Sequence, residues 1–188
     1  LPVPPGFTIT TEACDLFNKA DGDWPEGMEK QVRENLRTLE EENGRRLGDP
    51  SDPLLVSVRS GAAISMPGMM DTVLNLGLNA ETLKGLAEKT GNPRFAWDSF
   101  RRFIQMFGDV VMGVSHAKFE AELQAVKDEK GVELDTELDV DDLKKVADRY
   151  KDLYSRELGE EFPSDPWKQL RLAIDAVFGS WSNPRAIR

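Results

Sequence analysis

The order of apolar and polar residues divides the chain into an N-terminal part with strands and a longer helical remainder. Residues 7–10 alternate as a strand does, whereas residues 54–58 form an apolar, partly β-branched run that is too short for a typical helix. Residues 72–76 have the pattern of a returning strand, and residues 61–70 carry glycines, a proline and small residues without any period. The sequence therefore predicts a buried strand at 54–58, a glycine-bearing loop and a second strand.

Two helices are predicted before this unit. A threonine, Thr10 or Thr11, is placed to cap a short helix that continues to Phe17. Pro25 suits the first turn of a longer helix in which apolar residues recur at helical spacing, and Gly44 is placed to end it. We expect this longer helix to cover a neighbouring layer with one face.

From residue 79 onward the periodicity is helical. Asp139 is placed to cap one helix, and residues 164–166 open the last one. We read the acidic stretch 133–142 as a solvated connection rather than a metal site. The apolar stripes of the helices predict the core: Phe103, Ile104, Phe107, Val111, Phe119, Leu123, Val126, Leu143, Val146, Tyr150, Tyr154, Leu170, Ile174, Val177, Phe178 and Trp181.

The length, the charge and the lack of long apolar runs exclude some classes of partner. The chain has 188 residues, which suits one domain or two small lobes, and 34 acidic against 24 basic residues give it a formal charge of −10. That charge repels the backbone of DNA and RNA, so we expect no nucleic-acid partner. No apolar run approaches the length of a membrane span, and the first residues lack the pattern of a signal peptide. We therefore expect no membrane partner either.

The single cysteine and the single histidine point to structural roles. Cys14 has no second cysteine with which to form an internal disulfide, which fits a reducing compartment and a small buried thiol. His116 follows Ser115 at a predicted helix start, so we expect it at the surface or near the helix cap. The chain also begins at Leu1 without an initiator methionine and stops at Arg188 without a polar tail. We expect further residues on both sides in the complete protein.

The segment from residue 59 to residue 72 is the strongest candidate for chemistry. Arg59 leaves a predicted strand where a loop begins, and there its guanidinium can hold an anion. The loop adds neutral donors and an adaptable apolar cover: Ser60, Ser65, Thr72, the backbone N–H groups of Gly61 and Gly68, and the side chains of Met66, Met69 and Met70. This set suits a polyphosphate. The alternative is a hairpin in which Arg59 pairs with a carboxylate and the methionines pack inward.

Two common nucleotide-binding motifs, G-x-x-x-x-G-K-[ST] and G-x-G-x-x-G, do not occur in the chain. Five other segments resemble the pyruvate, phosphate dikinase family: VPPGFTITT at 3–11, VRSGA at 58–62, SMPGMMDTVLN at 65–75, WDSFRRFIQM at 97–106 and SWSNPRA at 180–186. The resemblance spans nearly the whole chain. It implies an α+β fold, namely a partial ATP-grasp-like nucleotide-binding lobe with a mostly α-helical insert.

The resemblance also implies a division of the chain and a reaction. Residues 1–78 would form the α+β part of the lobe with the phosphate loop, residues 79–163 a helical insert, and residues 164–188 a helix that returns to the lobe. The parent enzyme would be a phosphotransferase that interconverts ATP, phosphate and pyruvate with AMP, pyrophosphate and phosphoenolpyruvate. The phosphoryl group would pass through a phosphohistidine in a domain of the same full-length protein, outside this chain.

Site residues and ligands follow from the same resemblance. Arg59 would act catalytically by contacting the ATP phosphates, and the loop would fold over them. The implied binding residues are Arg59, Ser60, Gly61, Ala62, Ser65, Met66, Pro67, Gly68, Met69, Asp71 and Thr72. ATP and Mg²⁺ are the implied cofactors, phosphate is a substrate, and the full-length enzyme would be a homodimer. Its location would be the cytoplasm, or the chloroplast stroma in a plant or alga.

Parts of the family's site are missing from this segment. The lysine-bearing segment that precedes residues 4–6 in the family is absent, and so are the downstream carboxylates that hold magnesium. Because phosphoryl transfer depends on positioning and on charge neutralisation, we expect little activity from the chain alone.

Two other interpretations stay open. One is a phosphoenolpyruvate synthase-like domain, in which water replaces phosphate as the second acceptor, although residues 65–70 favour the dikinase. The other is a noncatalytic docking module, in which the helical insert recruits a partner.

Arg101 and Arg102 are adjacent on a predicted helix, so their side chains cannot share one outward direction. One of them is a candidate for an inter-domain contact. The alternative is a solvated arginine beside the core.

Overall fold

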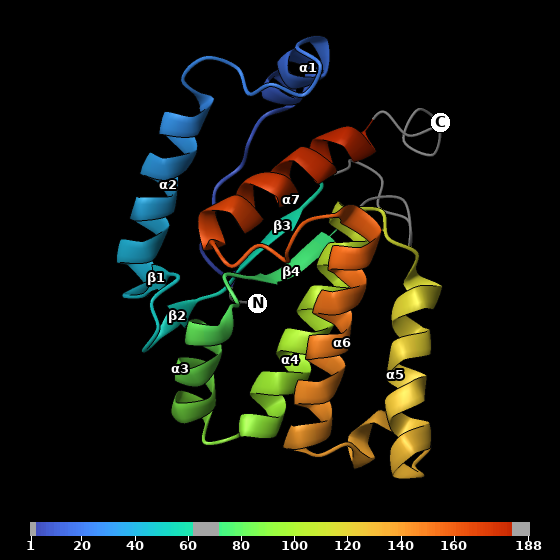
Figure 1. The fold of residues 1–188 in the computed structure, drawn as a ribbon. Coiled ribbons are helices and arrows are strands. Elements are labelled where there is room, and N and C mark those ends of the chain that lie inside the picture. The colour runs from blue at the N-terminus through green and yellow to red at the C-terminus, as the bar shows by residue number, and fades with distance from the viewer. Residues whose placement is uncertain (1–2, 62–71, 182–188) are drawn as a thin grey trace.

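The structure is a computed structural model that describes residues 3–61 and 72–181. It is α+β, with helices outweighing two short sheets in the described part, so the predicted class is confirmed (Figure 1). The elements, in chain order, are α1 (Thr11–Lys19), α2 (Met28–Asn43), β1 (Arg46–Leu47), β2 (Pro53–Leu54), β3 (Val56–Arg59), β4 (Thr72–Leu76), α3 (Ala80–Thr90), α4 (Pro93–Met106), the π-helix η1 (Phe107–Val111), α5 (His116–Lys130), the 3₁₀ turn η2 (Asp135–Glu137), α6 (Val140–Leu158) and α7 (Pro166–Ser180).

The strands β3 and β4 form an antiparallel pair at the centre of the molecule. Arg59 lies opposite Thr72 and Val58 opposite Val73, with a register irregularity between Val56 and Val58. The helix α7 packs against both strands, and α4 packs against β4 (Figure 1). A separate parallel pair joins β1 to β2. The hairpin therefore sits between α7 and the helical remainder.

The strand predictions are confirmed only in part. The returning strand at 72–76 is present as β4. Residues 7–10 form no strand, so that prediction is wrong: a strand exists through hydrogen bonds to a neighbour, and no described strand pairs with this segment. The run 54–58 divides at Leu55 into β2 and β3, and the side chains of β3 alternate between half-buried and exposed. A continuous buried strand was therefore also a wrong expectation.

The two N-terminal helices are confirmed, with one boundary shifted. Thr10 occupies the N-cap position of α1, although its side chain makes no capping hydrogen bond. Gly44 ends α2 in the left-handed conformation, at φ 64°, where a residue without a side chain carries no steric penalty. The helix α2 begins at Met28, because Pro25 lies in a preceding turn in which its carbonyl accepts from the Met28 N–H.

The helical remainder begins at the predicted caps. The Asp139 side chain accepts from the N–H groups of Asp141 and Asp142 at the start of α6, and Asp165 accepts from the Trp167 N–H at the start of α7. At the start of α3, Asn79 makes a capping box and also donates to the Ser164 carbonyl. The helix α6 packs against both α4 and α5, which gives the lower half of the molecule in Figure 1.

The predicted core is confirmed except at two residues. Most of the apolar stripe residues are buried, whereas Val111 and Trp181 are only partly so. One polar residue is buried among them: Gln169 of α7 is fully enclosed. Its side chain donates to the carbonyls of Leu78 (2.9 Å) and Pro163 (2.8 Å) and accepts from the Gly77 N–H (2.9 Å). Gln169 therefore ties α7 to the end of β4 and to the segment before α7.

The end of α4 widens into the π-helix η1. A β-carbon added at Gly108 in this segment would lie 2.4 Å from the Phe119 ring, so the glycine lets α5 approach closely. Two residues before Gly108, the Met106 sulfur accepts a hydrogen bond from the Leu74 N–H at 3.2 Å. The junction between α4 and η1 therefore contacts β4 on one side and α5 on the other.

Candidate functional site

The end of the β3–β4 hairpin at which residues 60–71 connect the two strands holds the described part of the predicted phosphate site. Arg59 and Gly61 are exposed there, while Ser60 and Thr72 are half-buried. The pairing of Arg59 with Thr72 places these two residues side by side, although they are far apart in sequence. The structure therefore brings together Arg59, Ser60, Gly61 and Thr72. The other predicted binding residues lie outside the described residues: Ala62, Ser65, Met66, Pro67, Gly68, Met69 and Asp71, together with Met70.

Among the described residues, Arg59 differs from Arg101 in having no carboxylate paired with it. Within residues 3–61 and 72–181, Arg59 makes no ion pair, so the hairpin alternative with a paired Arg59 has no support there. Arg101, in contrast, is only 3% exposed and contacts Asp98 and Asp135, each at 2.8 Å. Burial alone would lower the pKa of Arg101, but the Asp98 carboxylate raises it. An exposed guanidinium without such a partner is available to an external anion.

These contacts distinguish the buried Arg101 from the exposed Arg102. Arg101 is buried in the helical part, where its guanidinium forms ion pairs with Asp98 and Asp135. Arg102 is exposed and pairs with Asp98 at 2.9 Å. The expectation that the two side chains point in different directions is therefore confirmed, and only Arg102 is accessible to another domain.

A hollow of about 910 Å³ lies beside the phosphate end of the hairpin. Its walls are mostly apolar and come from residues 3–11, from α2, from residues 54–61 and from α7 with Trp181. Arg59, Ser60 and Gly61 line it as well. Sequence reasoning missed this hollow, since its walls come from four separate segments and no local pattern signals it.

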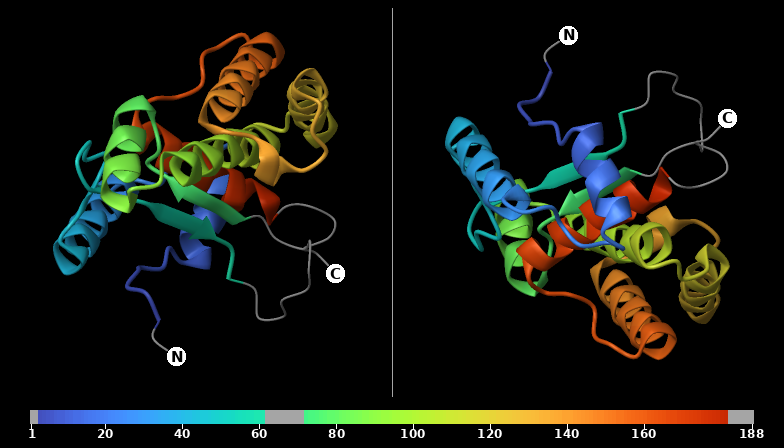
Figure 2. Two further views of the ribbon diagram at one scale, coloured as in Figure 1. Left: turned by 90° about the horizontal axis from the view of Figure 1, so that it is seen from below. Right: turned by 90° about the horizontal axis from the view of Figure 1, so that it is seen from above.

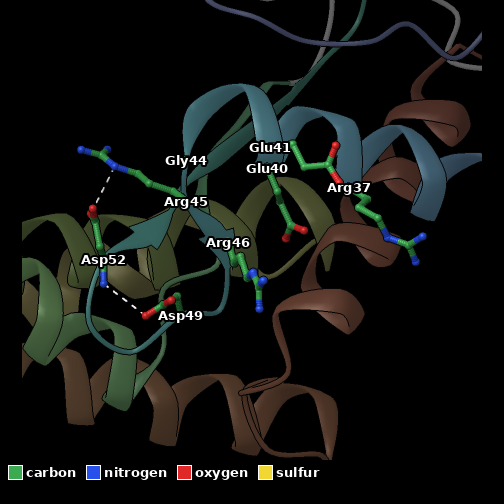
Figure 3. Close-up of a pocket in the computed structure, with 8 residues that line it drawn as sticks. All are labelled: Arg37, Glu40, Glu41, Gly44, Arg45, Arg46, Asp49 and Asp52. Atoms are coloured by element: carbon green, nitrogen blue, oxygen red, sulfur yellow. Dashed lines mark hydrogen bonds and ion pairs between the residues drawn. The ribbon is translucent and has the colours of Figure 1, made fainter.

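A second hollow, of about 640 Å³, lies at the end of α2 and is lined by charged residues (Figure 3). Its residues are Arg37, Glu40, Glu41, Gly44, Arg45, Arg46, Asp49 and Asp52. Arg45 pairs with Asp52 at 3.2 Å, and the Asp49 carboxylate accepts from the Ser51 N–H. The three guanidinium groups point in different directions in Figure 3, so they do not converge on one anion. This hollow is therefore a weaker candidate than the hairpin end.

The remaining candidates take the structural roles expected of them. Cys14 is 5% exposed, and burial raises the pKa of its thiol, so the thiol is held in its unreactive form. The His116 side chain is 60% exposed at the start of α5, with Nδ1 3.0 Å from an Asp109 oxygen. Its predicted place at the surface is confirmed.

Carboxylates of the acidic stretch 133–142 form ion pairs with neighbouring and more distant basic residues. Asp139 and Asp142 both pair with Lys130, which lowers the pKa of Asp139 to about 2. Asp135 pairs with Arg101 and with Lys127. In the described part of the chain, no three His, Cys, Asp or Glu side chains gather as a metal site. No helix of the described residues is long and apolar enough to cross a membrane.

Comparison with known proteins identifies the family. The family model described as the AMP/ATP-binding domain of pyruvate phosphate dikinase matches residues 20–188. The chain is 60% identical to pyruvate, phosphate dikinase 1, chloroplastic, of Arabidopsis thaliana over 186 residues, which cover 99% of this chain and 19% of that protein. It is 55% identical to pyruvate, phosphate dikinase of Clostridium symbiosum over 188 residues, which cover the whole chain and 22% of that protein.

The matches agree with the fold and with the candidate site. The fold and the exposed Arg59 at the hairpin end fit a nucleotide-binding domain, and the matched family model is of that class. The chain belongs to the pyruvate phosphate dikinase AMP/ATP-binding domain family. It spans about a fifth of the length of the curated relatives that it matches. The resemblance noted from the sequence is therefore confirmed.

Proposed function

We propose that this chain supplies the Arg59 side of the ATP-phosphate site in a pyruvate, phosphate dikinase. The complete enzyme would convert ATP, phosphate and pyruvate to AMP, pyrophosphate and phosphoenolpyruvate, through a phosphohistidine that lies outside this chain. The proposal is supported by the family match and by relatives whose names all describe that dikinase. Those names also favour the dikinase over the phosphoenolpyruvate synthase alternative.

One observation carries the proposal. The β3–β4 pairing holds Arg59 beside Thr72 at the end where the chain connects the two strands, with Ser60 and Gly61 next in the chain. An arginine offers a planar fork of donors that matches phosphate oxygens, and a glycine lets the backbone approach them closely. We extend the proposed contact surface to the family-implied residues that the structure does not describe: Ala62, Ser65, Met66, Pro67, Gly68, Met69 and Asp71.

The magnesium ions and the partners are part of the same proposal. The family resemblance implies Mg²⁺, and we propose that its ligands lie outside this chain. We further propose that the enzyme is a homodimer and resides in the cytoplasm or in a chloroplast stroma. Relatives named chloroplastic support the second location.

The three-part division of the chain also stays a proposal. It is supported by the run of helices from α3 to α6 within residues 79–163, and by the packing of α7 against β3 and β4. The noncatalytic alternative would assign the main role to the helical part. Arg102 is the residue that separates the two ideas, since it is exposed on α4 of the helical part.

The test compares two half-reactions in the full-length enzyme. We expect Arg59→Ala to slow the ATP-dependent phosphorylation of the carrier domain by about 10–1000-fold, because a charge-assisted bidentate contact contributes about 1.5–3 kcal/mol per hydrogen bond. Phosphoryl exchange between pyruvate and phosphoenolpyruvate should stay nearly unchanged. Arg59→Lys keeps the charge and loses the fork, so it should fall between the two.

Arg102→Ala is the matched control, as it removes an exposed arginine that pairs with Asp98. It should leave both half-reactions near the parent rate. An equal loss of both half-reactions in Arg59→Ala would refute the assignment of Arg59 to the ATP site. A loss of carrier phosphorylation in Arg102→Ala alone would favour the docking function of the helical part.

A further inference from the structure

We propose that Asn75 is a positioning residue for the ATP-dependent step, because it holds an irregularity in β4 that places Thr72 opposite Arg59. This proposal rests on the proposed function, in which Arg59 contacts the phosphates of ATP. Asn75 acts through the pairing of the two strands and not by contact with the nucleotide. Its effect on the reaction therefore depends on Arg59.

The pairing of β3 with β4 contains one extra residue on the β4 side. Arg59 lies opposite Thr72. Three residues earlier on β3, Val56 lies opposite Leu76, which is four residues later on β4. The additional residue falls in the segment 74–75, where the register shifts. Such an insertion is a β-bulge, and it offsets the pairs on its two sides by one residue.

Without the bulge, the strands would meet in a different register at the phosphate end. Continued regularly from the pair of Val56 and Leu76, β3 would bring Arg59 opposite Val73. Thr72 would then lie one residue, about 3.3 Å, farther along the strand. The burial agrees with the bulged register, because Val73 and Leu76 are both fully buried although a regular strand would turn them to opposite faces.

The backbone conformation of Asn75 fits this irregularity. Its φ is 60°, in the left-handed region, and among the described residues other than glycine only Asp21 also has a positive φ. Asparagine adopts this conformation more readily than most residues that carry a side chain, whereas a β-branched residue strongly disfavours it. The identity of residue 75 therefore decides whether the bulge forms without strain.

A contact from the neighbouring helix supports the bulge. The N–H of Leu74, next to Asn75, donates to the Met106 sulfur at 3.2 Å. The extra residue of a bulge is left out of the hydrogen bonds between strands, so a backbone group there needs another partner. In both views of Figure 2, α4 lies on the β4 side of the hairpin and α2 on the β3 side. The partner therefore comes from the helix that packs against β4.

A double-mutant cycle in the full-length enzyme tests the proposal. Asn75→Val disfavours the bulge, and we expect it to slow ATP-dependent phosphorylation of the carrier domain at least about tenfold, since a misplacement of about 1 Å can cost about 100-fold. Phosphoryl exchange between pyruvate and phosphoenolpyruvate should stay unchanged. In the Arg59→Ala background, Asn75→Val should cause little further loss, because Asn75 acts through Arg59.

Two other variants separate the bulge from the side chain that forms it. Asn75→Gly allows a positive φ and should retain most of the rate of carrier phosphorylation. Met106→Leu keeps an apolar side chain and removes the sulfur acceptor, so it should cause a smaller loss than Asn75→Val, with the same dependence on Arg59.

Asp21→Val is the matched control for backbone strain. Asp21 is exposed in the turn after α1 and has a φ of 52°, so valine there introduces the same kind of strain outside the hairpin. It should lower the unfolding midpoint of the enzyme without slowing either half-reaction.

Three results would overturn the proposal. One is a parent-like rate in Asn75→Val, and another is a rate in Asn75→Gly as low as that in Asn75→Val. The third is an equal slowing by Asn75→Val with and without Arg59→Ala, which would show a general structural effect. A parent-like rate of carrier phosphorylation in Arg59→Ala alone would instead refute the proposed function, so the two failures are distinguishable.

Discussion

Replacing Gln169 by leucine is the most direct test of how α7 holds the hairpin. The leucine side chain is similar in size and apolar, so it removes the amide while keeping most of the packing. Three backbone groups then lose their partner in a buried position, namely the Gly77 N–H and the carbonyls of Leu78 and Pro163. Each buried group left without a hydrogen bond costs about 1–3 kcal/mol, so we expect a loss of about 3 kcal/mol or more.

The assay is equilibrium unfolding of the 188-residue chain by heat or urea, followed by circular dichroism. For a chain of this length, a loss of about 3 kcal/mol corresponds to about 6–12 °C in the unfolding midpoint. Gln124→Leu is the control, since Gln124 is exposed and contacts only Asp128, and it should change stability by less than about 0.5 kcal/mol. A cost below about 1 kcal/mol for Gln169→Leu would refute the reasoning.

Gln169→Glu adds a pH readout to the same test. Its carboxylate has no proton to donate, so at neutral pH it would face the carbonyl oxygens of Leu78 and Pro163 and the stability would fall. On acidification the carboxyl gains a proton and can donate to one of them. The deficit relative to the parent chain should therefore shrink as the pH falls, and a deficit independent of pH would contradict the assigned hydrogen bonds.

Three further predictions concern separate parts of the molecule. The isolated chain should bind Mg-ATP with a dissociation constant of about a millimolar or weaker, equivalent to roughly −4 kcal/mol, because it supplies only one side of the site; a micromolar constant in calorimetry, abolished by Arg59→Ala, would contradict this. Burial raises the pKa of Asp175, so its stabilising contribution is complete below the unfolded pKa and is lost as the pH rises through the folded one. The parent chain should therefore gain stability relative to Asp175→Asn on acidification, measured as the unfolding midpoint against pH, and parallel curves would refute this. Gly108→Ala should destabilise by about 1–3 kcal/mol, because the new methyl group meets the Phe119 ring, whereas Gly179→Ala meets nothing within 4 Å and should be neutral or stabilising in the same unfolding assay.

Local signals explain which elements could be predicted from the sequence. The caps at Asp139 and Asp165, the terminal Gly44 and the apolar stripes all act within a few residues, and the structure has helices at each of them. The strand expected at 7–10 failed for the opposite reason, because alternation shows only that a segment suits a sheet and does not supply the neighbour that a strand needs.

Only part of the candidate site could be predicted from local sequence signals. The sequence makes Arg59 a candidate because the other candidate residues lie next to it in the chain, and its pairing with Thr72 agrees with the predicted return of the strand. The hollow could not be predicted, since its walls come from segments as distant as residues 3–11 and α7. The burial of Arg101 was hidden likewise, because one of its two carboxylates, on Asp135, is 34 residues away.

The π-helix η1 adds one residue to the last helical turn after α4. Its wider turn accommodates an extra residue compared with an α-helix, so the chain leaves it in a direction that α-helical geometry would not produce. Removing a single residue at Phe107 would restore the ordinary pitch and turn the rest of this segment, Gly108 included, by about 100° around the axis. Gly108 would then no longer face the Phe119 ring that it accommodates. The length of this segment therefore sets where Gly108 lies relative to α5.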